Sequence, residues 1–274
     1  MNFEKEAENF FRVIDSGACG AAFNMALDEA LAISVREAGL PAIRFYGWER
    51  PALSLGRFQK DKKGFHSDFI RESGLPVVVR PTGGRAVLHL PGELTYSVSS
   101  RFEGAFRGKN LFECYGIISS AISRALGRLG ADVEVKLERR GGPAAGISAG
   151  QGGNGKNAHC FQCVSYAEIT SGGRKLVGSA QRRWPDGFLQ QGSIPFEIDG
   201  PLQGRIFRGF DPLAMSGLNE IVPGPADRSR ETLKRYLTEE FRAVLGVDLL
   251  AAAPARRERA LARDLLPAYE SSCF

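Results

Sequence analysis

The chain has 274 residues, of which 43% are hydrophobic and 24% charged, a balance typical of a globular protein in water. No apolar run approaches the ~20 residues of a membrane-spanning helix. The polar first residues also lack the basic and then apolar pattern of a secretory signal. We therefore expect a cytoplasmic protein that binds no membrane. The formal net charge of +5 favours acidic partners without choosing among them.

The cysteines of the chain are five in number: Cys19, Cys114, Cys160, Cys163 and Cys273. An odd number in a chain without an export signal argues against a disulfide framework. Each cysteine is therefore either a buried apolar residue or a reactive thiol.

The first predicted element is a helix over residues 22–35, whose apolar residues recur at four-residue spacing. Asn24 is its expected N-cap. Asp28 and Glu29 stand near its start, where acidic side chains suit the helix dipole.

Five β-like runs follow, rich in β-branched or alternating apolar residues. They cover residues 42–48, 52–58, 75–79, 86–89 and 94–99. The sequence Gly83-Gly84-Arg85 interrupts the series. We therefore predict an antiparallel meander with a glycine loop inserted in it.

The clearest helix covers residues 111–129, whose apolar residues form one stripe, and Gly130 follows it as the expected stop. A short strand is expected around 133–135. Residues 140–157 are dominated by Gly, Ala and Ser, which predicts a flexible loop. This loop is either a tolerated surface insertion or a mobile flap beside an active site, because it ends just before Cys160.

The second half of the chain predicts a hairpin, one further strand and two helices. Their ranges are 164–170 paired with 175–181, then 188–198 with a break at Gly192, then 230–245 and 255–266. Strands interleaved with a few helices, without a βαβ rhythm, predict an α+β fold with a mixed β-sheet and surrounding helices. No linker divides the chain, so we expect one domain over 1–274, with a core over about 20–250 and a C-terminal helical extension.

Cys160 is the first candidate for chemistry, because it follows the glycine-rich loop and His159 and precedes the predicted hairpin. A nearby cation would lower the pKa of such a thiol and make it a nucleophile. Its position alone equally fits a buried, inert cysteine. Cys160 and Cys163 also form a CxxC pair, but no second pair follows at finger-like spacing, so we expect no metal site.

Two further stretches offer polar groups to a ligand. Gly83-Gly84-Arg85 provides backbone N–H groups and a guanidinium for a phosphate, a carboxylate or a carbonyl oxygen, although such pairs of glycines also serve turn geometry. Lys175 begins an apolar strand that continues into Gly178-Ser179-Ala180, although a lysine in a hairpin is commonly a surface residue. Three histidines, His66, His89 and His159, provide no Ser-His-Asp set that the sequence identifies. Nucleotide-binding glycine loops at a strand–helix junction are absent.

Four stretches taken together resemble the lipoate and biotin protein ligase superfamily, and most closely its octanoyltransferases of the LipM type. The first three are 24–31 (NMALDEAL), 51–59 (ending SLGRFQ) and 80–97 (RPTGGRAVLH and then ELTYS). The fourth lies within 160–194 and consists of Cys160-Phe161, Ser165, Glu168, 173–181 and 189–194. They cover roughly residues 20–200 in the order and spacing of the family. The combination is specific, whereas no single stretch is.

The resemblance implies a mixed sheet with helices around it and an active-site groove at the sheet. It implies that Cys160 carries the acyl group as a thioester and that Lys175 binds the acyl carbonyl. It further implies that the acyl pocket is lined by residues of the 80–89 and 178–180 segments, namely Arg80, Gly83, Gly84, Arg85, His89, Gly178, Ser179 and Ala180.

The implied reaction moves an octanoyl group from acyl carrier protein to Cys160, and then to a lysine of a lipoyl domain, which is either glycine cleavage H protein or an E2 subunit. No cofactor and no nucleic acid is expected, and ATP is not needed because one thioester replaces another. The ligase branch usually has Asn-Asp where this chain has Cys160-Phe161, which favours a transferase. An ATP-dependent lipoate–protein ligase, a transferase between two lipoyl domains and a non-catalytic binding protein are the alternatives. Gln191, where the family often has His, and Ala167, where it usually has an aromatic residue, depart from the pattern.

Overall fold

The computed structural model describes residues 10–37, 39–136, 168–222 and 226–270. The predicted loop over 140–157, the start of the predicted hairpin over 164–167, and Cys160, Cys163 and His159 lie outside these ranges. Within the described residues, no helix is long and apolar enough to cross a membrane. The cytoplasmic location stays a prediction.

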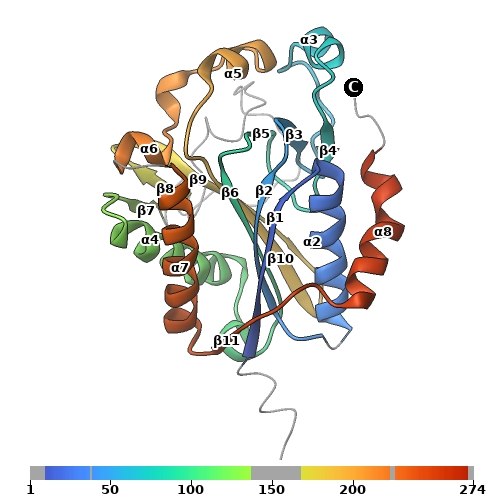
Figure 1. Cartoon of the computed structure of the whole chain (residues 1–274), viewed down its shortest axis with the longest axis vertical. Helices are drawn as coiled ribbons and strands as arrows, with labels where there is room; N and C mark the ends of the chain where they lie inside the picture. Colours follow the sequence, from blue (N-terminus) through green and yellow to red (C-terminus); the bar gives the residue numbers. More distant parts are fainter. Residues whose placement is uncertain (1–9, 38, 137–167, 223–225, 271–274) are drawn as a thin grey trace, which may run out of the picture.

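A mixed β-sheet of eight strands forms the centre of the described structure (Figure 1), with the order β11-β1-β2-β6-β10-β9-β8-β7. Its strands are β1 (Phe10–Cys19), β2 (Ala42–Trp48), β6 (Leu94–Arg101), β7 (Glu134–Lys136), β8 (Glu168–Ser171), β9 (Arg174–Arg183), β10 (Gly187–Ile194) and β11 (Asp248–Ala251). Strand β1 pairs in parallel with β2 and β11, whereas β2, β6, β10, β9, β8 and β7 pair antiparallel. The mixed sheet of the predicted α+β fold is therefore confirmed.

A second, three-stranded sheet has the order β4-β3-β5. Its strands are β3 (Ala52–Leu55), β4 (Val77–Val79) and β5 (Val87–His89), and β3 pairs in parallel with β4. The predicted antiparallel meander is therefore wrong, although its strands exist. The reason is that the chain leaves the large sheet after β2 and returns to it only at β6, which pairs with β2.

Helices cover both faces of the large sheet, as Figure 1 shows. Helices α2 (Ala21–Arg36) and α8 (Arg256–Glu270) lie on one side, and α4 (Leu111–Arg128) and α7 (Ala226–Leu245) on the other. Shorter helices α3 (Ser67–Glu72), α5 (Gly200–Ile206) and α6 (Leu218–Ile221), and 3₁₀ turns η1 (Gly104–Phe106) and η3 (Pro212–Ala214), complete the described elements.

Strand alternation assigns each residue of the central strands to one of these two faces. Ile43 and Phe45 of β2 join the apolar core that α4 and α7 cover. Tyr46 and Trp48 join the core of α2 and α8. On the face of the sheet toward α2, strands β6 and β10 carry polar residues, and these polar residues are also buried. The candidate site is built on this polar face.

Two local expectations were wrong. The N-cap of α2 is Gly20, and Asn24 lies inside the helix, where its Nδ2 donates to the carbonyl oxygens of Gly47 (2.9 Å) and Cys19 (3.3 Å). Strand β10 is not broken at Gly192, because the ladder with β6 runs through it without a register shift. A single domain over the chain stays a prediction.

Candidate functional site

A pocket lies between the polar face of the large sheet and the small sheet, with α2 at one side. Its lining residues come from six strands, from the loops beside them and from α2. They are Met25, Tyr46, Trp48, Ser54, Arg80, Val87, His89, Thr95, Gly178, Ser179, Ala180, Gln191, Gly192 and Ser193. Of the predicted acyl-pocket residues, Arg80, His89, Gly178, Ser179 and Ala180 are thus brought together.

The Gly83-Gly84 loop is held beside this pocket by the side chain of Arg80. One guanidinium nitrogen, Nη2, donates to the carbonyl oxygens of Gly83 (2.6 Å) and Arg85 (2.7 Å). The loop also packs on Gly56, where an added Cβ would lie 1.9 Å from the carbonyl oxygen of Gly84. Gly83, Gly84 and Arg85 do not line the pocket themselves. They lie next to its wall, because a Cβ at Gly84 would be 3.7 Å from the Cβ of Ala180.

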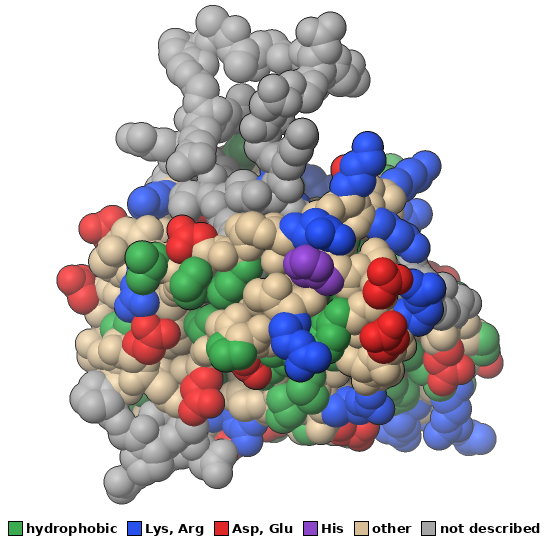
Figure 2. All heavy atoms as spheres, turned by 90° about the horizontal axis from the view of Figure 1, so that it is seen from above, with side chains coloured by type: hydrophobic (Ala, Val, Ile, Leu, Met, Phe, Trp, Pro, Cys, Tyr) green, Lys and Arg blue, Asp and Glu red, His purple; other side chains and the backbone are tan. Residues whose placement is uncertain are grey.

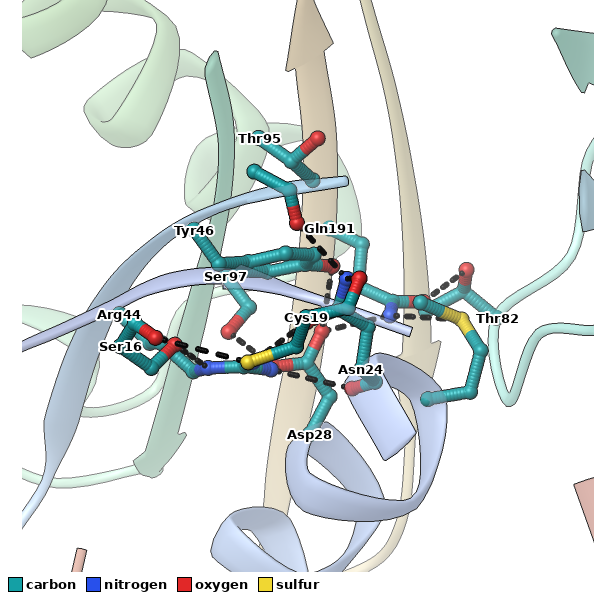
Figure 3. Close-up of polar contacts among 12 residues, drawn as sticks. Ser16, Cys19, Asn24, Asp28, Arg44, Tyr46, Thr82, Thr95, Ser97 and Gln191 are labelled. Carbon is teal, nitrogen blue, oxygen red and sulfur yellow. Dashed lines mark hydrogen bonds and ion pairs between the residues drawn. The ribbon is translucent and has the colours of Figure 1, made fainter. Parts of the chain in front are cut away.

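Asp28 is the centre of a buried polar network on the floor of the pocket (Figure 3). Its Oδ1 accepts from Nη1 of Arg44 (2.8 Å) and Oγ of Ser97 (2.7 Å). Its Oδ2 accepts from the hydroxyl of Tyr46 (2.8 Å) and Nε2 of Gln191 (2.7 Å). Four donors on one carboxylate explain how an acidic residue is tolerated here with no exposed surface.

The same network fixes the protonation of its tyrosine. Burial, followed by the neighbouring Asp28 carboxylate, raises the pKa of Tyr46 well above its ordinary value. The phenol therefore remains a hydrogen-bond donor at neutral pH. Arg44 stacks over the same ring with 4.0 Å between its guanidinium carbon and the ring centroid.

A second network surrounds Glu93. Its Oε1 accepts from Nδ1 of His89 (2.6 Å), from Oγ1 of Thr95 (2.7 Å) and from Oγ of Ser193 (2.9 Å). The other ring nitrogen of His89, Nε2, lies 2.8 Å from Oγ of Ser54. The His89 ring also stacks on Trp48 with 3.9 Å between centroids.

Lys175 is fully buried at the start of β9, and its Nζ forms an ion pair with Oε1 of Glu168 on β8. It does not line the pocket. It lies three residues before Gly178, which does, and thus at that end of the pocket. The expected surface position of a hairpin lysine is therefore excluded, and the role implied for Lys175 stays a proposal.

The model of the lipoyl protein ligase A/B catalytic domain family matches residues 20–242. An octanoyltransferase LipM from Geobacillus kaustophilus is 40% identical over 97% of this chain and 97% of its own length. The chain belongs to the lipoyl protein ligase A/B catalytic domain family. A second octanoyltransferase LipM, from Bacillus subtilis, is 36% identical over 85% of this chain and 77% of its own length.

Solved structures of lipoate protein ligases share the fold. Lipoate-protein ligase A bound with ATP superimposes with a TM-score of 0.77, 19% identity and 96% of both chains covered. The bipartite archaeal lipoate protein ligase from Thermoplasma acidophilum gives a TM-score of 0.71 and 18% identity, over 97% of this chain and 94% of its own. At these identities the likeness concerns the fold alone.

Within this family fold, Gln191 takes the position where the resemblance leads one to expect His. Its side-chain amide links two neighbours: Nε2 donates to Asp28, and Oε1 accepts from Oγ1 of Thr82 (2.8 Å). A neutral histidine also has one donor and one acceptor, so glutamine preserves this pattern of hydrogen bonds. Ala167, the other departure, lies outside the described residues.

The cysteines inside the described ranges are poor nucleophiles. Burial raises the pKa of the Cys19 thiol, and it also raises the pKa of the Cys114 thiol. Cys160, the predicted acyl carrier, lies outside the described residues. Among the residues that the structure describes, no group of three or more His, Cys, Asp or Glu could hold a metal ion.

Several residues of the pocket wall and of the two polar networks behind it were not predicted from the sequence. Asp28 was interpreted as a helix-dipole residue, and Arg44, Tyr46, Trp48, Ser54, Glu93 and Thr95 were assigned no role. A usable signal existed in β2, where an arginine stands in an otherwise apolar strand of seven residues. Such an arginine must find a buried anion, and Asp28 in the neighbouring helix was an available partner.

Proposed function

We propose that the protein is an octanoyltransferase of lipoate biosynthesis that accepts an octanoyl group on Cys160 and transfers it to a lysine of a lipoyl domain. The observation that carries the proposal is the 40% identity to an octanoyltransferase over nearly the whole of both chains. The donor is octanoyl-acyl carrier protein, and the acceptor is glycine cleavage H protein or an E2 lipoyl domain.

The pocket supports an acyl substrate. Its wall includes the apolar side chains of Met25, Val87 and Ala180 and the rings of Tyr46 and Trp48. Burial of each CH₂ of an acyl chain contributes about 0.8 kcal/mol. The carboxylate oxygens of Asp28 and Glu93 accept hydrogen bonds within their own networks. They therefore do not require water molecules in the pocket.

The chemistry consists of two acyl transfers. The Cys160 thiolate attacks the carbonyl carbon of the donor thioester, a new C–S bond forms, and the carrier thiolate leaves with its electron pair. In the second step the amine of the acceptor lysine attacks, a C–N bond forms, and the Cys160 thiolate is released. We assign Lys175 to the carbonyl oxygen, where a cation stabilises the developing oxyanion in both steps. Its ion pair with Glu168 holds the ammonium group inside the protein.

The net charge of +5 favours acidic protein partners. Figure 2 shows that basic and acidic side chains are interspersed over the face seen from above. Among the described residues this mixture forms no patch of a single sign, so only the net charge favours an acidic partner.

The experiment is to incubate the protein with octanoyl-acyl carrier protein without ATP and to weigh it intact by mass spectrometry. The expected result is one octanoyl adduct that maps to Cys160 and disappears in Cys160→Ala. Cys114→Ala and Cys163→Ala are the matched controls and retain the adduct. Addition of a lipoyl domain then discharges the adduct onto a lysine of that domain.

Absence of an adduct on the wild-type protein would refute the proposed donor and intermediate. Octanoate with ATP as the only productive acyl source would instead indicate a lipoate–protein ligase. An adduct formed only from an octanoylated lipoyl domain would indicate a transferase between two lipoyl domains. Lys175→Ala is expected to slow acyl-enzyme formation by about 100-fold, the effect of losing one oxyanion donor.

A further inference from the structure

A second groove, separate from the acyl pocket, lies at the start of helix α2. Its volume is about 540 Å³, and its walls come from the first residues of α2, from α3, from the loop into β4 and from the end of α8. None of its lining residues lines the acyl pocket. Figure 1 shows the C-terminal end of α8 next to α2 and near β4. The proposed reaction gives this groove no role.

The walls of the groove are largely apolar, and they join two cores. Phe23 and Leu266 are half-buried residues at the edge of the core that α2 and α8 share. Leu75 and Val77 are half-buried residues at the edge of the core of the small sheet. Because these side chains keep apolar surface in water, an apolar group that covered them would stabilise the fold.

The groove also offers main-chain groups that its own elements do not pair. Strand β4 is at the edge of the small sheet, so its outer side has no strand partner among the described residues. The N–H groups of residues 21–23 precede the first helical bond of α2, in which Asn24 donates to the carbonyl oxygen of Gly20 (2.9 Å). Gly20 has no side chain to cap them, and the first turn contains no acidic residue. A segment that covers the groove therefore needs oxygen acceptors as well as an apolar side chain.

The last described residues lie on the wall of this groove. Tyr269 and Glu270 end α8 and line the groove, and the Tyr269 hydroxyl donates to Glu29 of α2 (2.5 Å). Residues 271–274 follow with the sequence Ser-Ser-Cys-Phe, outside the described ranges. Four residues reach about 14 Å when they are extended. They carry serine hydroxyls, main-chain carbonyl groups and one aromatic ring, which are the groups that the groove lacks.

We propose that residues 271–274 fold back into this groove and cover its apolar walls with the ring of Phe274. The inference goes beyond the proposed function and does not depend on it. The serine hydroxyls or the carbonyl oxygens of the segment accept hydrogen bonds at the start of α2. The occupant is a segment of the same chain because it begins at the wall, which gives it a higher effective concentration there than a separate molecule has.

The groove adjoins the elements that build the acyl pocket. Met25 lines the pocket two residues after the wall residue Phe23 of α2. Arg80 lines it two residues after the wall residue Val78 of β4. The docked segment therefore braces α2 and the end of β4 at the places where they meet the pocket.

The first test locates Cys273 by cross-linking. Arg71→Cys places a thiol on the wall of the groove, at an exposed residue whose ion pair with Asp68 is also exposed. A short bis-maleimide is expected to join position 71 to Cys273 within one chain, as peptide mass spectrometry would show. Glu72→Cys is the matched control, since Glu72 is the next residue of α3, is also exposed and does not line the groove. We expect at least tenfold more cross-link for Arg71→Cys than for this control, and none after Cys273→Ser.

The second test measures what the ring contributes. Phe274→Ser is expected to lower Tm by about 6 °C, as the loss of a covered phenylalanine does in a chain of this size. The control is Phe58→Ser, because Phe58 is 78% exposed and lies outside the groove. Its expected change in Tm is below about 2 °C, as for other surface residues. Differential scanning calorimetry of the full chain measures both variants.

Three results would each overturn the proposal. They are a cross-link no more frequent for Arg71→Cys than for Glu72→Cys, a cross-link that joins two chains, and equal changes in Tm for Phe274→Ser and Phe58→Ser. A cross-link between two chains would assign the groove to a second copy of the protein. Both tests use the full chain without an acyl substrate, so they decide this proposal whether or not the protein transfers octanoyl groups.

Discussion

Asp28 shows how one buried residue can hold a site together. It stands in the second turn of α2 and joins strands β2, β6 and β10 through Arg44, Tyr46, Ser97 and Gln191. Its ion pair with Arg44 has no exposed surface on either side. Removal of one partner from such a pair leaves a buried charge without compensation.

Asp28→Asn is therefore expected to lower the free energy of unfolding by about 3 kcal/mol, as for other broken buried pairs. The asparagine has one acceptor oxygen for four donors, and Arg44 keeps its charge. Urea unfolding monitored by circular dichroism measures the effect.

The matched control is Asp68→Asn in the exposed pair with Arg71, whose side chains are 88% and 63% accessible. Its expected effect is below about 0.5 kcal/mol, as for most surface pairs. A loss below about 1 kcal/mol for Asp28→Asn would mean that the carboxylate charge is not what stabilises the floor.

At the scale of elements, Gly192 of β10 packs against the ring of Tyr96, which belongs to β6. An added Cβ at Gly192 would lie 2.3 Å from a ring carbon of Tyr96 and 2.5 Å from its hydroxyl oxygen. That hydroxyl lies 2.7 Å from Oγ of Ser179, a residue of the pocket wall. Gly192 thus allows three adjacent strands to meet around one ring.

Gly192→Ala is expected to lower the free energy of unfolding by about 2 kcal/mol, because Tyr96 must leave its rotamer or the strands must separate. The same movement disturbs the Tyr96–Ser179 contact, so octanoyl-enzyme formation slows as well. Gly116→Ala in α4 is the control, since nothing lies within 4 Å of its Cβ position. In a helix that change stabilises by about 0.5–1 kcal/mol. Equal effects at the two glycines would contradict the contact argument.

The elements that could be predicted from the sequence are those whose own residues show a clear apolar periodicity. The boundaries of β2 were predicted as observed, and α4 differs from its prediction by one residue at its end. The small sheet could not be predicted, because partner choice among β3, β4, β5 and β6 depends on contacts far apart in sequence. Strand β1 was not predicted either, and its partner β11 lies more than 200 residues away.

The site was predicted in part for a similar reason. Arg80, His89 and the 178–180 segment were found because they belong to short motifs. The polar face of β6 was missed, because alternation with Thr95 and Ser97 is typical of a strand with one side in water. In the protein that side is covered by α2 and the small sheet, and its hydroxyls donate to Asp28 and Glu93.

On the scale of the whole molecule, helix α8 closes the side of the fold on which the pocket lies. The Arg12 guanidinium of β1 forms a bidentate pair with Glu258 of α8 at 2.9 and 2.8 Å. At the other end of the helix, the Tyr269 hydroxyl donates to Glu29 of α2, which also accepts from Arg182 of β9. The C-terminal helix is thus tied to the same helix that carries Asp28.

Three buried tyrosines, Tyr46 and Tyr96 of the large sheet and Tyr269 of α8, make this assembly sensitive to alkali. Burial raises the pKa of all three, and a neighbouring carboxylate raises that of Tyr46 and Tyr269 further. Above pH 10 the unfolded chain releases protons that the folded protein still holds, so stability falls as pH rises. The contribution is fully present below pH 10 and decreases by about 1.4 kcal/mol per pH unit for each tyrosine.

Tyr46→Phe isolates one of these protons. At pH 7 tyrosine and phenylalanine are both neutral at this position. We expect the variant to be less stable by about 1 kcal/mol because Asp28 loses one hydrogen-bond donor. Above pH 10 the wild type loses about 1.4 kcal/mol per pH unit more than the variant. The two curves of unfolding free energy should therefore cross near pH 11, as urea unfolding at pH 7 to 11.5 would show. Parallel curves would mean that Tyr46 ionises equally easily in the folded protein, and that the network of Asp28 does not hold its proton.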